Sequence, residues 1–398
     1  MSPQQAQTPV KGLPTSDLFQ EATHIAARHA EDVDIHARFP SEAVDALRAS
    51  GALSWYVPRE YGGAGANIEE LAEGTFELSR RCASTGMIFA MHQIQVGSIV
   101  RHKANSCWFE QYLKRLVREQ RLIASATSEQ GIGGNLLRSI AALEPVTDNG
   151  VDTVCFEKSA TTVSYGAHAD DVLTTVRRNP AADQGDQVLV LTHISEMDNK
   201  QAAEWDTMGM RGTCSPGFVL RARCLRDQVL PVPFGAIAAE TVVPFSHILW
   251  AHVWLGLAVD AFERAQNFVR AQARQNPGTP PPSALRLSEL SVRMAEFRAL
   301  VRGATKEYAG LADGDGRCEL STIGYTVRIN NLKIAVSEAA VDICQSALRI
   351  CGIAGYKNTG PFSVCRQLRD AYSAVLMHAN DRILATNAAM LLIYREAK

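Results

Sequence analysis

The sequence lacks the features typical of membrane, nucleic-acid-binding and disulfide-stapled proteins. Its 40 basic and 42 acidic residues give a formal net charge of -2, so no summed positive field attracts nucleic acid or anionic lipid. Its nine cysteines include no C-x-x-C pair and no histidine partner at zinc-finger spacing, which predicts reduced thiols and no metal site. No segment runs ~18 apolar residues without charge. We therefore expect a cytoplasmic protein without a membrane or nucleic-acid partner.

The composition is that of a folded chain. Of the 398 residues, 46% are hydrophobic and 21% are charged, which is too apolar for a disordered protein. At roughly 100–200 residues per domain, this length predicts two or three packed units.

The hydrophobic pattern changes twice along the chain. Residues 1–121 carry apolar residues three and four apart, which predicts an α-helical domain. Residues 122–239 contain short β-rich runs such as QVLVLTHI between turn residues, which predicts a small β domain. Residues 240–398 return to helical periodicity in four long stretches, which indicates a four-helix bundle. The predicted fold class is α+β.

Five local motifs in this order resemble those of the acyl-CoA dehydrogenase superfamily. They are YVPREYGGAGAN at 56–67, SATSEQGIGGN at 125–135, WDTMGMRGTCSPGFVL at 205–220, ICGIAGY at 350–356 and RQLRDAY at 366–372. The resemblance covers essentially the whole chain. It implies an N-terminal α-helical domain, a β-barrel-like middle domain, a C-terminal four-helix bundle and an FAD cofactor.

The resemblance implies that the 125–135 loop contacts the flavin. Thr127 and Ser128 would supply donors to the polar edge of the ring, while Gly131, Gly133 and Gly134 would let the backbone approach the pyrophosphate.

A further hydroxyl contact is expected on the next β-stretch. Counting from Lys158 places it at Thr162, which we prefer, whereas counting back from Asp170 favours Ser164. Either residue could instead be an ordinary polar residue of a surface strand.

The adenine half of FAD would be bound by a neighbouring subunit. The family's R-x-x-F-G motif corresponds to Arg274 through Gly278, with Pro277 in place of phenylalanine, and its G-G pair is Gly352-Ile353. These positions imply a homo-oligomer, either a dimer or a tetramer, with less secure adenylate contacts than flavin contacts.

The usual catalytic glutamate is missing. Aligned from the R-D-A motif at 369–371, its position is occupied by His378 and the following threonine position by Asn380, which we expect to contact the flavin. Some relatives carry the base near the position of Ser246, which also lacks a carboxylate. His378 is the candidate base, because imidazole titrates near neutral pH. Packing on a helix is an equally weighted alternative for His378.

His92 occupies a family position on a helix that lines the substrate cavity. We predict a pocket residue there, beside the alternative that it packs between helices as a polar residue.

Three functions compete. The first is oxidation of an acyl thioester, carried by CoA or by a carrier protein, at its α,β carbons with a non-standard base. The second is a flavin-dependent monooxygenase acting on a small molecule, which needs no α-deprotonation. The third is a degenerate flavin-binding protein. Fold alone does not choose among them, and the first is the leading hypothesis.

Overall fold

The structure is a computed structural model that describes residues 16–148, 150–312 and 315–395. It begins with a helical section, as predicted. The helices are α1 Asp17–Ile35, α2 Ser41–Ala49, α3 Ile68–Arg81, α4 Ala83–His102 and α5 Cys107–Glu119. A capping box starts α3, because the Asn67 side chain accepts from the Glu70 N–H and the Glu70 carboxylate accepts from the Asn67 N–H. Helix α4 is buried along most of its length and contacts both β1 and the C-terminal helix α7.

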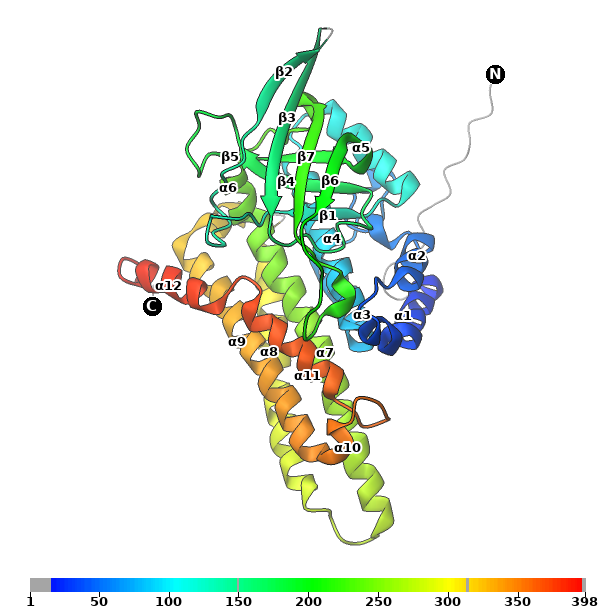
Figure 1. Ribbon diagram of the computed structural model, residues 1–398. Coiled ribbons are helices and arrows are strands. Elements are labelled where there is room, and N and C mark those ends of the chain that lie inside the picture. Colours follow the sequence, from blue (N-terminus) through cyan, green and yellow to red (C-terminus); the bar gives the residue numbers. More distant parts are fainter. Residues whose placement is uncertain (1–15, 149, 313–314, 396–398) are drawn as a thin grey trace.

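The middle section consists of two sheets (Figure 1). The first has the order β1-β4-β5, with β1 and β4 parallel; its strands are β1 Ile123–Ala126, β4 Asp171–Arg177 and β5 Gln187–His193. The second is antiparallel with the order β2-β3-β7-β6; its strands are β2 Glu144–Asp148, β3 Val151–Ala160, β6 Met197–Gln201 and β7 Phe218–Leu225.

The expectation of a barrel-like middle domain is wrong, because neither sheet closes within the described residues. Strands β2 and β6 remain as the edges of the second sheet. Alternation of apolar and polar residues predicts strands, but closure depends on which edges pair across the sequence. The residue pattern does not indicate the short edge strands β2 and β6, because EPVTD and MDNKQ carry little β-type hydrophobicity.

The C-terminal section is a helical bundle. Its helices are α6 Phe234–Ile237, α7 Val243–Gln275, α8 Ser283–Ala312, α9 Ile323–Cys351, α10 Ile353–Tyr356, α11 Cys365–Leu376 and α12 Asn380–Leu391, with a π-helical turn at Ala238–Val242. Among the described residues, Phe234–Gln275 is the one helical stretch long and apolar enough to cross a membrane. However, 83% of its most apolar window is buried inside the protein, as expected for a core helix.

The last predicted helix is not continuous. It breaks at Met377–Ala379, where His378 adopts a left-handed φ of 52°. Helix α12 then leaves the long axis of the bundle (Figure 1). Helical periodicity continues across the break, so the residue pattern alone does not predict it.

Candidate active site

A cavity of about 710 Å³ lies where the three sections meet. Its walls come from α4, from the loop after β1, from residues 162–164 and 205–215, from the start of α7, and from the break between α11 and α12. This volume lies within the range of small-molecule and cofactor sites. Much of the wall is apolar, and it includes five methionine side chains, those of residues 87, 91, 208, 210 and 377.

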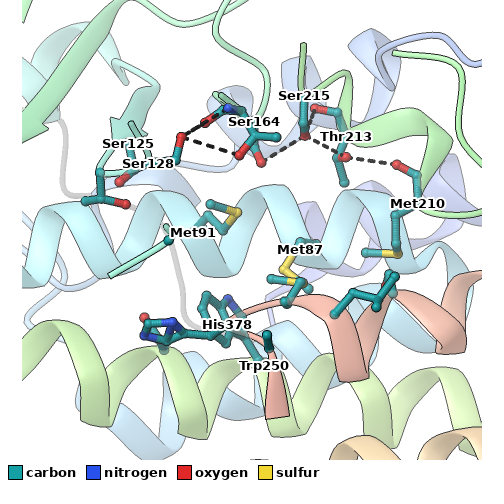
Figure 2. Close-up of a pocket in the computed structure, with 18 of the residues that line it drawn as sticks. Met87, Met91, Ser125, Ser128, Ser164, Met210, Thr213, Ser215, Trp250 and His378 are labelled. Atoms are coloured by element: carbon teal, nitrogen blue, oxygen red, sulfur yellow. Dashed lines mark hydrogen bonds between the residues drawn. The ribbon is translucent and has the colours of Figure 1, made fainter. Parts of the chain in front are cut away.

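Hydroxyl groups line one wall of the cavity (Figure 2). The Ser128 hydroxyl donates to the Thr162 carbonyl over 2.8 Å and accepts from the Thr162 N–H over 3.0 Å. Further along, the Ser215 hydroxyl lies 2.9 Å from those of Ser164 and Thr213. Thr162 and Ser164, the two alternatives for the flavin contact, both line the cavity.

Met87 and Met91 of α4 lie between this hydroxyl wall and the opposite wall, where Trp250 and His378 stand (Figure 2). The cavity therefore combines a hydrogen-bonding edge with apolar faces.

The loop after β1 is held by a buried carboxylate. Glu129 accepts hydrogen bonds from the Ser139 hydroxyl at 2.7 Å, from the Ile140 N–H at 3.1 Å and from the Ala141 N–H at 2.7 Å. Its Oε2 lies 3.6 Å from Nζ of Lys158, which is also buried. This network fixes the backbone that presents Thr127 and Ser128 to the cavity.

Gly133 and Gly134 both adopt left-handed φ values, of 61° and 72°. Gly134 lines the cavity, and a Cβ there would stand 1.7 Å from an Nη of Arg382 on α12. Gly133 is outside the lining, and a Cβ there would meet no atom within 4 Å. Of these two glycines, only Gly134 lies close to a side chain of α12.

The 205–215 segment is tied to α11. The Asp370 carboxylate accepts from the Met210 N–H over 2.6 Å, and burial raises the pKa of Asp370 to about 6. A Cβ on Gly209 would stand 2.2 Å from the Arg369 carbonyl oxygen, so that glycine permits the contact. These contacts join the motif at 205–220 to the motif at 366–372, which gives a structural reason for both.

His378 lines the cavity from the break between α11 and α12. The break is bound by Lys333 of α9, whose Nζ donates to the Ala374 carbonyl over 3.0 Å and to Asn380 Oδ1 over 2.6 Å. Burial, together with the positive charges of Lys333 and Arg382, lowers the pKa of His378 to about 4. The imidazole is therefore neutral at pH 7.

Asn380 does not line the cavity. Its amide is buried, accepts from Lys333 and donates to the Ser337 hydroxyl over 3.1 Å. Asn380 therefore stabilises the break between α11 and α12 through Lys333 and Ser337, and does not face the cavity in which we expected it to contact the flavin.

His92 is likewise placed in the core, outside the cavity lining. Its Nδ1 accepts from the Ile123 N–H over 3.0 Å, and its Nε2 lies 2.6 Å from the Leu53 carbonyl oxygen. A carbonyl only accepts, so Nε2 carries the hydrogen. Both ring nitrogens join α4 to its neighbours, as the packing alternative supposed.

Of the remaining predicted residues, Ser246 lines the cavity whereas Arg274 and Gly352 do not. Both of these are exposed, Arg274 near the end of α7 and Gly352 at the end of α9.

Sequence reasoning missed His247, which follows Ser246 and also lines the cavity. It is only 1% exposed, and its Nδ1 lies 3.1 Å from the Ile329 carbonyl oxygen. No motif pointed to it, because its contacts come from a helix about 80 positions away in the chain.

None of the residues that line the cavity in the described part of the chain is aspartate or glutamate. Nor does any group of three or more His, Cys, Asp or Glu side chains in that part suit a metal ion. The ionisable lining groups are thus histidine, arginine and tyrosine.

Two family models match this chain: the N-terminal domain of acyl-CoA dehydrogenase at residues 19–120 and its C-terminal domain at residues 235–390. The chain belongs to the acyl-CoA dehydrogenase family and is a flavin-dependent oxidoreductase of that fold.

Several individual proteins are similar to it. A dibenzothiophene monooxygenase of Mycolicibacterium goodii is 25% identical over 335 residues, which cover 79% of each chain. A short-chain-specific acyl-CoA dehydrogenase of Clostridium acetobutylicum is 23% identical over 361 residues, covering 86% of this chain and 87% of that one. The crystal structure of FMN-bound TdsC from Paenibacillus sp. A11-2 has a TM-score of 0.81 at 20% identity, covering 96% of this chain and 98% of that chain.

The residues present fit a flavin ring. An isoalloxazine needs hydrogen-bonding groups at its polar edge and apolar cover over its faces. The hydroxyl wall at Ser128, Thr162 and Ser164 provides the first, and the methionine and tryptophan side chains provide the second.

Proposed function

We propose that this protein is a flavin-dependent monooxygenase that transfers one atom of O₂ to a small, largely apolar molecule. The observation that carries the proposal is the absence of any carboxylate among the described residues lining the cavity. The similarity to a dibenzothiophene monooxygenase supports it.

Oxidation of an acyl thioester is the less favoured function. That reaction must remove an α-proton, so it needs a base whose pKa lies near the working pH. His378 stands at the expected position, but its pKa of about 4 makes it a weak base. His247 is a still weaker one, because burial and the neighbouring His378 lower its pKa to about 3. A CoA-bound or carrier-bound substrate is accordingly not part of the proposal.

When bound, reduced flavin supplies the electrons with which O₂ is activated. This chain's residues would bind the ring and exclude water. Ser128, Thr162 and Ser164 would contact its polar edge, while Met87 and Met91 would keep the space beside it dry. A neutral His378 would hydrogen-bond to the reacting groups without adding charge.

The test is isotopic. The flavin-loaded protein is reduced with dithionite, freed of excess reductant and mixed with ¹⁸O₂ and candidate small aromatic substrates. Catalase is present to remove free peroxide. We expect a product that carries one ¹⁸O atom, and no such product from reduced flavin without protein.

The opposing experiment uses the oxidised holoprotein under anaerobic conditions with a series of acyl-CoA thioesters. Bleaching of the flavin absorbance by any of them, with formation of the unsaturated thioester, would refute the monooxygenase proposal in favour of dehydrogenation.

A further inference from the structure

His247 presents an unsatisfied hydrogen-bond acceptor at the cavity. Its Nδ1 lies 3.1 Å from the Ile329 carbonyl oxygen, and since a carbonyl only accepts, Nδ1 carries the hydrogen. In the neutral ring, Nε2 then holds a lone pair. Burial, the neighbouring His378 and Lys333 keep the ring neutral by lowering its pKa to about 3.

Nε2 of His247 is buried and has no hydrogen-bond partner among the described residues. The side chain is only 1% exposed, yet it belongs to the cavity lining. A buried acceptor is ordinarily paired, and leaving it unpaired is unfavourable. A molecule that enters the cavity can provide the missing donor.

The surroundings restrict what that donor is. The rings of Trp250 and His378 lie 6.1 and 6.2 Å from the His247 ring, centroid to centroid, which favours a flat ring as the neighbour. Lys333 is buried close enough to affect the pKa of both histidines, and Arg382 lines the same cavity. These positive charges disfavour an ammonium group. The donor is therefore a neutral N–H or O–H group.

We propose that Nε2 of His247 accepts a hydrogen bond from a neutral N–H or O–H group on an aromatic substrate, and thereby selects donor-bearing rings over rings of the same shape without a donor. This inference rests on the proposed function to the extent that the cavity is the substrate site.

The test compares indole with indene, which has a CH₂ group where indole has its N–H. Both dissociation constants are measured by calorimetry on the oxidised, flavin-loaded, full-length protein. His247→Asn removes the acceptor at Nε2 but keeps an amide N–H near the position of Nδ1, so the bond to Ile329 is retained. We expect the indene-to-indole ratio of dissociation constants to fall about 5- to 100-fold in this variant, the range for a buried acceptor left without a donor.

Two further variants sharpen the comparison. His247→Gln places a carbonyl oxygen near Nε2 and is expected to retain part of the preference for indole. His252→Asn is the matched control, because His252 is another buried histidine of α7, contacts the Ile248 carbonyl through Nδ1 at 2.9 Å and does not line the cavity. Its ratio should equal that of the unmodified protein.

A ratio that His247→Asn leaves unchanged would overturn the proposal, as would binding of indene but not indole, or of neither compound, by the unmodified protein. If His247→Asn fails to retain flavin, the decision passes to His247→Gln together with the unmodified protein. Binding is measured on the oxidised protein without reductant, so it does not depend on oxygenation. If the protein prefers indole over indene through His247 but transfers no oxygen, that result refutes the proposed function and leaves the role of His247 in binding in place.

Discussion

The buried pair of Glu129 and Lys158 allows a test of whether this ion pair anchors the 125–135 loop. Glu129→Gln keeps the size of the side chain but replaces one acceptor oxygen with an NH₂ group. That NH₂ group cannot accept the hydrogen bonds that Glu129 now accepts, at 2.7 to 3.1 Å, from the Ser139 hydroxyl and from the N–H groups of Ile140 and Ala141. Lys158 would be left without its carboxylate in a site where it is 1% exposed. Breaking a buried pair in this way costs about 3–5 kcal/mol.

The assay is urea unfolding, followed by tryptophan fluorescence and circular dichroism, with flavin affinity measured in parallel. We expect Glu129→Gln to lower the free energy of unfolding by about 3–5 kcal/mol and to weaken flavin binding, because the loop loses its anchor. Glu144→Gln, at an exposed glutamate of β2, is the matched control and should change neither quantity.

A double-mutant cycle with Lys158→Met isolates the pair. Removing both charges leaves neither one unpaired, so the double variant should lose at least about 1 kcal/mol less than the sum of the single variants. Additive losses, or a Glu129→Gln variant within about 0.5 kcal/mol of the original protein, would show that the network does not hold the loop.

Three further predictions concern His378, the glycines of the 125–135 loop and Arg274. The His378 ring should stay neutral down to about pH 5 in NMR titrations, and a ring that titrates near pH 6.5 would contradict this. Because the pKa of His378 is lower in the folded protein than in the unfolded chain, the free energy of unfolding should decrease as the pH falls from about 6.5 towards 4. Gly134→Ala should weaken flavin binding more than Gly133→Ala, since both have left-handed φ but only the first meets Arg382; equal effects in titrations of the apoprotein would exclude that contact as the cause. Arg274→Ala should weaken FAD binding in a homo-oligomer without affecting the cavity, to be checked by light scattering and flavin titration, and a flavin-saturated monomer would refute a shared site.

Much of the architecture could be predicted from the sequence. Periodicity separated the helical, β and helical sections, and the run QVLVLTHI formed β5 as predicted. It could not predict closure or the two edge strands, because pairing between distant strands leaves little trace in local hydrophobicity.

The candidate site was predicted less evenly. Motifs in the sequence identified the 125–135 loop, Thr162, Ser246 and His378. In the structure, residues of that loop and the three other side chains all line one cavity. His92 and Asn380 occupy the expected positions in the chain, but their side chains are turned into internal hydrogen bonds.

The sequence by itself therefore determined the family, the order of the sections and the loss of the glutamate, because these depend on residue identity and spacing along the chain. Only the tertiary structure decided the charge state of His378, the break that presents it and the buried, unpaired Nε2 of His247. Each of these depends on groups of α9, namely Lys333 and the Ile329 carbonyl, that are distant in sequence and adjacent in space. Burial and contact of this kind arise from packing, which no local pattern of residues encodes.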